Sequence, residues 1–307
     1  MNQKRLQKIF PGPGTVNTIA LYGNYAPETA EQVKKRVLEL HARFSFFEAE
    51  SDIFRINEQA GIKPVTVHPD TLFVLFHALA YGAETRGAFD ITTGAANRLW
   101  RDAIRCAKMP SDSALAEGCG RNGLSDLVLD ETESTAFLRR KGMQIDLGGI
   151  AKGYAADQAL QILKKNKVRH ALLNFGETVI ALGREQKIGI QHPYQKNGQS
   201  IAEVSVKNKA VVTSGTYERG FFSQGRRYHH ILNPRTGCPA DSGLLSVTLV
   251  GQSAMELDAL ATGLCVLGRN AGLPLLEKRG IEAVFIDNEG EIRITPGLQG
   301  KFLLRRN

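Results

Sequence analysis

The part of the chain from Val168 to Val250 most constrains the fold, because it contains one short apolar run after another with little room for helices between them. The runs read HALLNFG, KIGIQ, AEVSVK, AVVTSG, YHHIL and LLSVTLVG. Runs of this length, separated by turn residues, predict strands joined by short connections. Because strands and helices do not alternate regularly along the chain, we expect an α+β fold with mixed or antiparallel sheets and flanking helices, and not a doubly wound sheet.

Helices are predicted before and after this segment from their 3.6-residue apolar period. The first covers residues 28–46, and its apolar stripe consists of Val33, Val37, Leu40 and Phe44. A second follows Pro69 and ends near Gly87, with Leu72, Leu75, Phe76 and Leu79 expected to point inward. Others are expected at about 253–267 and 271–279, together with strands at 15–23 and within 126–147, a loop at 48–61 and a closing hairpin at 283–294.

The chain is expected to form one domain. No unit of 20 to 50 residues repeats, and no low-complexity linker divides the 307 residues. A chain of this length can bury one large core or two closely packed lobes. We therefore expect a single two-lobed domain over residues 1–307, in which 1–13 is an N-terminal lead segment.

Composition and charge exclude several classes of protein. With 42% hydrophobic and 23% charged residues the chain is not disordered, and its four cysteines lack the C-x-x-C spacing of a zinc knuckle. The net charge of +8 is spread in small basic groups interleaved with acids, so we expect no nucleic-acid partner. No apolar run reaches the ~20 residues of a membrane span, and no signal peptide is visible. We expect no transmembrane segment and a cytoplasmic location, or a periplasmic one if the sequence is a trimmed form.

The stretch IDLGGIAKGYAADQALQIL, residues 145–163, predicts a strand, a glycine turn and a helix. It fits neither the G-x-x-x-x-G-K-[ST] phosphate loop nor the G-x-G-x-x-G dinucleotide motif. Gly148 and Gly149 would let a ligand approach the backbone closely, Asp146 could point into a crevice, and the free amides of the helix suit an anion. The alternative is a tight turn in which Asp146 only caps the helix.

Asp258 and Thr262 are a candidate metal-binding pair. They lie four residues apart on a predicted helix, so they share one face. A carboxylate and a hydroxyl are oxygen donors that Mg²⁺ accepts. Although such a pair usually lies on a solvated face, this face is otherwise apolar, and a carboxylate there needs a partner.

Histidines and aromatic residues supply further candidates. In a strand His229 and His230 must face opposite ways, so one can be structural while the other lines a site. The motif GAFDITTG places Phe89 and Asp90 where a ring and an acceptor could hold a ligand, and Phe47 lies at a loop edge. Buried packing is the default for both phenylalanines.

Together and in this order, the motifs resemble those of the ApbE family of FAD:protein FMN transferases. The matching segments are ESDIFRIN, GAFDITTGAANRLW, IDLGGIAKGYAAD, VTSGTYERGF, HHILNPRTGCP and LDALATGLCVLG. The resemblance implies an α+β fold with FAD in a cleft between two lobes. It also implies Mg²⁺-dependent transfer of FMN from FAD to a threonine hydroxyl of a target flavoprotein, with release of AMP.

The resemblance also implies roles for individual residues. By position, the FAD contacts are Phe47, Ala88, Phe89, Asp90, Asp146, Lys152 and Leu232. The metal positions are Gly149 through its carbonyl, Asp258, Ala261 and Thr262, and His230 matches the histidine tied to transfer. One departure is Glu177, which stands where the family often has the second of two glycines.

Two other functions remain open on sequence alone. A Mg²⁺-dependent FAD pyrophosphatase, giving FMN and AMP, would need the same electrophile and differ only in using water. A non-enzymatic flavin-binding protein would need no paired oxygen ligands for a metal. AMP release from FAD without an acceptor would indicate the pyrophosphatase, and covalent flavin on the purified chain would indicate the binding protein.

Overall fold

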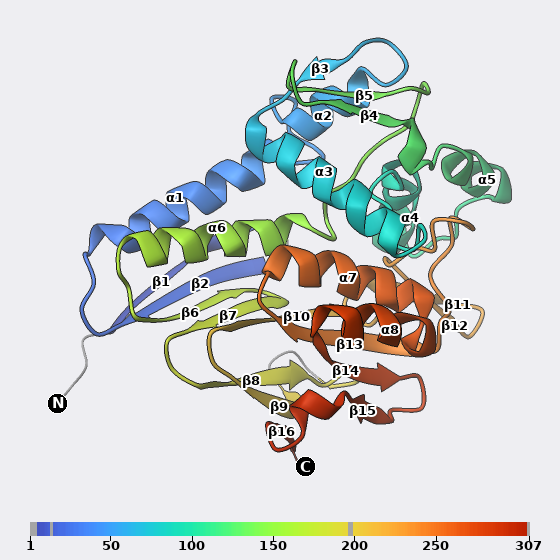
Figure 1. Ribbon diagram of the computed structural model, residues 1–307. Helices are drawn as coiled ribbons and strands as arrows, with labels where there is room; N and C mark the ends of the chain where they lie inside the picture. Colours follow the sequence, from blue (N-terminus) through green and yellow to red (C-terminus); the bar gives the residue numbers. More distant parts are fainter. Residues whose placement is uncertain (1–4, 13–14, 196–198, 306–307) are drawn as a thin grey trace.

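A large antiparallel sheet organises the molecule. The computed structural model describes residues 5–12, 15–195 and 199–305. Its eight-stranded sheet has the order β1-β2-β6-β7-β10-β13-β14-β15, and each neighbouring pair is antiparallel (Figure 1). The strands are β1 (Arg5–Gly12), β2 (Thr15–Tyr22), β6 (His170–Phe175), β7 (Thr178–Leu182), β10 (Lys209–Gly215), β13 (Leu244–Gly251), β14 (Glu282–Asp287) and β15 (Ile292–Ile294). This confirms the predicted α+β class with antiparallel sheets.

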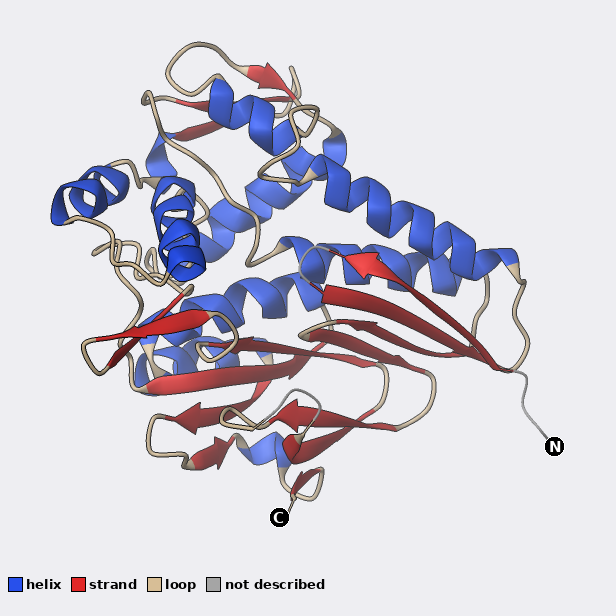
Figure 2. Ribbon diagram, turned by 180° about the vertical axis from the view of Figure 1, so that it is seen from behind, coloured by secondary structure: helices blue, strands red, loops and turns tan. Residues whose placement is uncertain are grey.

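The two faces of this sheet have different covers. Helices α1 (Glu28–Arg43), α6 (Ala151–Lys165), α7 (Ala254–Leu267) and α8 (Arg269–Arg279) lie on one side, and the small sheet β16-β9-β8 lies on the other (Figures 1 and 2). The strands of the small sheet are β8 (Gln186–Gln191), β9 (Ser200–Val206) and β16 (Phe302–Leu304). Side chains alternate accordingly: Ile180 packs in the helix-side core, whereas Val179 and Ala181 pack against the small sheet.

A second layer of elements stands above the helices in Figure 1. It contains α2 (Asp52–Glu58), α3 (Pro69–Glu84), α4 (Gly94–Cys106) and α5 (Asp112–Gly120), with the sheet β3 (Val65–Thr66), β5 (Thr135–Leu138) and β4 (Leu127–Asp130). The hairpin β11 (Gly220–Ser223) and β12 (Arg226–His229) packs beside α4 through Trp100, which stacks on Tyr228. Two short 3₁₀ helices are η1 (Leu124–Asp126) and η2 (Pro296–Leu298).

Most predicted helices are found, with two errors. Val33, Val37, Leu40 and Phe44 are all buried, as expected. The inward position of Phe76 is wrong: its side chain is 39% exposed, and Val74 and Ala78 take the buried face of α3 instead. The predicted loop at 48–61 contains helix α2, whose first turn is capped by Ser51 accepting from the Phe54 amide at 2.9 Å.

Two strand predictions also need correction, and one strand was not predicted. Residues 145–147 are extended but form no strand. The Asn57 side chain accepts from the Ile145 amide at 2.7 Å and donates to its carbonyl at 3.0 Å, and the Asp146 amide donates to the Ile91 carbonyl. Strand β12 ends at His229, before the rest of the YHHIL run. Within the lead segment, residues 5–12 form the edge strand β1, while 1–4 and 13 lie outside the described residues.

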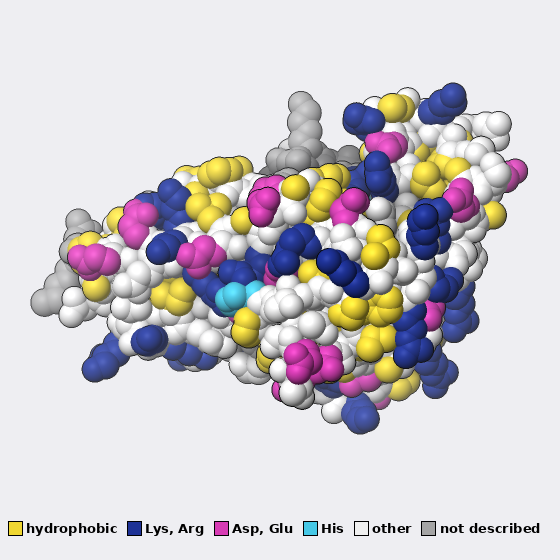
Figure 3. Space-filling view, turned by 90° about the horizontal axis from the view of Figure 1, so that it is seen from above, with side chains coloured by type: hydrophobic (Ala, Val, Ile, Leu, Met, Phe, Trp, Pro, Cys, Tyr) yellow, Lys and Arg dark blue, Asp and Glu magenta, His cyan; other side chains and the backbone are white. Residues whose placement is uncertain are grey.

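The surface agrees with the interleaved charges of the sequence. On the face seen in Figure 3, Lys and Arg side chains are separated by acidic and apolar ones. Within the described ranges, no helix has the length and apolar character needed to cross a bilayer.

Candidate functional site

One cavity collects most of the residues predicted for the site. Its volume is about 310 Å³, and it lies where α4 and the loop before it face the ends of β7 and β10 and the helices α6 and α7. Of the predicted residues, those that line it are Ala88, Phe89, Asp90, Asp146, Gly149, Lys152, His230, Leu232, Asp258 and Thr262. The described lining includes five carboxylates but three Lys or Arg side chains, so the cavity has an excess of negative charge.

The packing of α6 against α7 brings two distant segments of this cavity together. The carboxylate of Asp157 on α6 accepts from the Ala254 and Met255 amides at 2.9 and 3.0 Å, and thereby caps α7. Gly153 makes a close approach possible, since a Cβ added there would lie 2.3 Å from the Ala254 carbonyl oxygen. The first two turns of α6 are therefore held against the first turn of α7.

Oxygen atoms from these two segments converge. Asp258 is 3% exposed, and its carboxylate accepts from the Gly153 amide at 3.0 Å. Burial raises the pKa of Asp258 above its usual value, although Lys152 and the Gly153 amide oppose the shift. A Cβ at Gly149 would lie 3.0 Å from the Thr262 hydroxyl oxygen, which in turn lies 3.4 Å from that of Ser214. The Gly149 turn and the Asp258 helix thus meet.

The chemistry of these oxygens fits Mg²⁺. Within the part of the chain that the structure describes, no three His, Cys, Asp or Glu side chains gather as a metal centre. A metal here would draw on one carboxylate, one hydroxyl and backbone oxygen, which are hard donors that leave room for water and phosphate. The excess negative charge of the cavity is a second reason to expect a bound cation. Without one, the carboxylates would repel an anionic ligand.

Asp146 lies at the opposite wall, on the extended segment that Asn57 holds. Its amide donates to the Ile91 carbonyl at 2.8 Å, and its carboxylate accepts from the Gly148 amide at 2.9 Å. The carboxylate also lies 3.2 Å from Arg101 Nη2. Asp146 therefore does not cap α6, which begins at Ala151, and one of its oxygens faces α4.

The loop before α4 is fixed by its own threonines. The carboxylate of Asp90 accepts from the Thr92 amide at 2.7 Å and from its hydroxyl at 2.6 Å. Burial raises the pKa of Asp90 despite these bonds. Phe89 is 3% exposed, and it packs with its ring against the Gly149 turn and with its Cβ and backbone against Gly263 of α7.

The two histidines have different surroundings, although only His229 belongs to strand β12. His229 is buried, with Nε2 3.0 Å from the Ala240 carbonyl oxygen. His230 lines the cavity, with Nδ1 3.4 Å from the Arg219 carbonyl oxygen. Burial, reinforced by the charge of Arg219, lowers the pKa of His230 to about 4, so the ring is neutral at pH 7.

The ammonium group of Lys152 interacts with two acidic side chains, Glu177 and Asp258. Its ammonium lies 3.7 Å from the Glu177 carboxylate and 3.4 Å from the Gly148 carbonyl oxygen. Burial disfavours the charge, but Asp258 and Glu177 together raise the pKa of Lys152 above its usual value. Lys152 is therefore protonated and positively charged at pH 7.

Two predicted residues do not line the cavity. Ala261 is fully buried inside α7, and Phe47 is 68% exposed. Phe47 is nevertheless connected to the site, because the Arg101 guanidinium lies over its ring at 4.8 Å and over that of Phe46 at 4.4 Å. Sequence reasoning missed Arg101 and Arg219, whose basic side chains gave no motif signal of their own.

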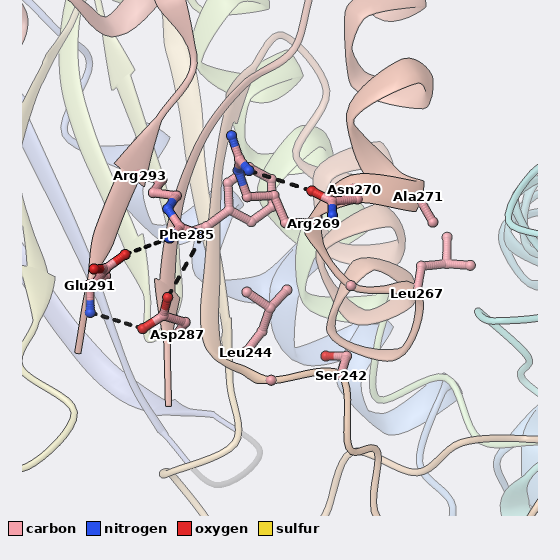
Figure 4. Close-up of a pocket in the computed structure, with 12 residues that line it drawn as sticks. Ser242, Leu244, Leu267, Arg269, Asn270, Ala271, Phe285, Asp287, Glu291 and Arg293 are labelled. Carbon is pink, nitrogen blue, oxygen red and sulfur yellow. Dashed lines mark hydrogen bonds and ion pairs between the residues drawn. The ribbon is translucent and has the colours of Figure 1, made fainter. Parts of the chain in front are cut away.

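A second cavity, of about 420 Å³, lies at the start of α8 beside the ends of β13, β14 and β15. Its acidic side chains are paired with Arg293, which contacts Asp287 and Glu291, while Arg269 donates a hydrogen bond to the amide oxygen of Asn270 (Figure 4). None of the predicted site residues lines it. The smaller, negatively charged cavity is therefore the candidate site.

Known proteins are similar to this chain in sequence and in fold. A family model described as the ApbE family matches residues 14–285. The chain is 35% identical over 267 residues to the FAD:protein FMN transferase of Klebsiella pneumoniae (strain 342), covering 85% of this chain and 84% of that protein. It is 35% identical over 283 residues to the FAD:protein FMN transferase of Treponema pallidum (strain Nichols), covering 84% and 78%. The crystal structure of the ApbE protein from Thermotoga maritima has a TM-score of 0.88 at 29% identity, covering 99% of this chain and 100% of that one.

Proposed function

The chain belongs to the ApbE family, and we propose that it transfers FMN from FAD to a threonine hydroxyl of a target flavoprotein, with Mg²⁺ as cofactor and AMP as the leaving product. The observation that carries this proposal is the convergence of Asp258, Thr262 and the Gly149 turn with His230 around one cavity. Relatives that span most of the chain carry the name FAD:protein FMN transferase.

The metal would be held by the carboxylate of Asp258, the hydroxyl of Thr262 and the carbonyl of Gly149, with Ala261 as a further backbone ligand. When bound, Mg²⁺ would polarise the pyrophosphate and neutralise charge that develops on its oxygens. Asp258 suits this role because its buried carboxylate has one amide donor within the described residues and gains from a cation.

The remaining cavity residues would bind and orient FAD. Lys152 offers a fixed positive charge to the pyrophosphate, and Asp146 offers an acceptor on the opposite wall. Ala88, Phe89, Asp90 and Leu232 would contact the nucleotide from the α4 side, and Phe47 would reach it from the rim beside Arg101. Holding the phosphorus in line with the attacking oxygen is the main contribution such residues can make.

His230 would accept the proton of the threonine hydroxyl. If Nδ1–H donates to the Arg219 carbonyl, the lone pair of Nε2 is free. The threonine oxygen then forms a bond to the phosphorus of the FMN half, the bond from that phosphorus to the bridging oxygen breaks, and AMP leaves. A neutral histidine is ready for this step at pH 7, although its lowered pKa makes it a weak base.

Co-expression with a threonine-containing candidate flavoprotein tests the proposal. We expect the target to gain the mass of FMN less one water on one threonine, in a Mg²⁺-dependent way. A parallel incubation with FAD alone measures AMP: slow release without the target supports transfer, whereas rapid release with no modified target would assign a pyrophosphatase and refute the transferase.

A further inference from the structure

Glu177 is placed in the cavity by the sheet itself. It occupies the two-residue turn between β6 and β7, where Gly176 has a φ of 75°. Its carbonyl accepts from the Thr213 amide at 2.9 Å, which ties the turn to β10. The side chain lines the cavity and is 30% exposed. Its position is therefore set by strand pairing rather than by a free loop.

The carboxylate of Glu177 forms an ion pair with Lys152, the lysine that an anionic ligand would contact in this cavity. Lys152 Nζ lies 3.7 Å away, and this is the ion pair that the structure shows for Glu177 among its described residues. An ammonium is a compact charge, so a phosphate that approaches Lys152 competes with this carboxylate. Among the described residues no ion pair is shown for Glu218, which also lines the cavity and whose charge acts on that of Glu177.

The charge balance makes this competition costly for the ligand. The described lining already has more carboxylates than basic side chains, and Glu177 adds to that excess. In a partly desolvated cavity such charges act more strongly than at an open surface. A neutral side chain of the same shape would leave Lys152 free for the ligand.

We propose that Glu177 is a positioning residue that limits the affinity of the site for its anionic substrate, by holding Lys152 in an ion pair that a phosphate group has to displace. The inference rests on the proposed function, in which FAD supplies the phosphates. Compared with a neutral residue in this turn, Glu177 weakens the binding of the anionic substrate and shortens the retention of the anionic product.

Equilibrium binding of FAD and of ADP, each with Mg²⁺ and without a target protein, tests the inference. ADP carries the adenosine and pyrophosphate but no flavin. We expect Glu177→Gln to lower the Kd for both about 3- to 10-fold, as release of a partly buried ion pair predicts. Glu177→Ala should act in the same direction, Glu177→Asp should stay within about twofold of the wild type, and Glu185→Gln, in the exposed turn after β7, is the matched control.

A double mutant separates the ion pair from simple repulsion. In a Lys152→Met background the gain from Glu177→Gln should fall to less than half, because no lysine remains to be released. An equal gain in that background, or unchanged or weaker binding by the single variant, would overturn the inference. Wild-type protein that binds neither FAD nor ADP would instead overturn the proposed function, and the inference with it.

Discussion

Replacement of Asp258 by asparagine should separate stability from metal binding. The carboxylate is 3% exposed and its pKa is raised by burial, so the ionised form is destabilising in the metal-free protein. Asparagine keeps an acceptor for the Gly153 amide, which donates to Asp258 at 3.0 Å. We therefore expect metal-free Asp258→Asn to be at least as stable as the wild type at pH 7.5.

With Mg²⁺ bound, the wild type should become more stable than Asp258→Asn. At a Mg²⁺ concentration of about 100 times its Kd, binding adds about 2.7 kcal/mol to the stability of the folded state. For 307 residues, an unfolding entropy of about 2.1 cal/mol/K per residue converts this into a Tm increase of about 4 °C. Asp258→Asn should lose most of that increase, because a neutral amide is a much poorer Mg²⁺ ligand.

Thermal unfolding at several Mg²⁺ concentrations measures both effects. The pH dependence adds a check on the sign: a raised pKa in the folded state means that wild-type stability is lost as pH rises through that pKa, so the advantage of the variant should be larger at pH 7.5 than at pH 4. The exposed Asp102→Asn on α4 is the control and should keep the full increase. An equal Mg²⁺ shift in Asp258→Asn would refute the metal role of this residue.

Three further predictions concern other parts of the account. His230→Gln should lower the transfer rate about 10²- to 10⁴-fold while FAD still binds; a rate within a few fold of the wild type would exclude a base role. Gly153→Ala should cost about 2–3 kcal/mol in chemical denaturation, because its Cβ would lie 2.3 Å from the Ala254 carbonyl oxygen; unchanged stability would show that α6 and α7 are not held as described. Burial and Lys152 lower the pKa of His41 to about 4, so wild-type stability should fall between pH 6.5 and 4 by up to about 1.4 kcal/mol per pH unit from this group. His41→Gln should lessen that slope, and an identical slope would contradict the assignment.

The fold was predictable where one local pattern dominated. Strands such as β13 and β14 bury alternate residues in two cores, and their apolar runs are visible in the sequence. Helix α2 was missed because seven residues are too few for a clear helical period, although Ser51 is a recognisable cap. Phe76 was misplaced because several apolar residues of α3 compete for the buried face, and only packing decides between them.

The sequence identifies the segments that line the cavity, but it does not predict the contacts between their side chains. Gly149, Asp258 and His230, which come from three separate motifs, line one cavity, while their roles stay predictions. The sequence predicts the extended conformation of residues 145–147 but not that they lie outside every named strand, because that depends on contacts with the side chain of Asn57, which is 88 residues away along the chain. The arrangement of Arg101 over two aromatic rings, and the pairing of Lys152 with Glu177, likewise depend on tertiary packing.

Anomalous diffraction from crystals grown with Mn²⁺ and ADP would test most directly whether these oxygens hold a divalent ion at the pyrophosphate. We expect one strong peak about 2.0–2.4 Å from an Asp258 carboxylate oxygen and from the Thr262 hydroxyl, with a diphosphate oxygen on its other side. A peak elsewhere in the cavity, or bound ADP without any peak between the Gly149 turn and α7, would contradict the account.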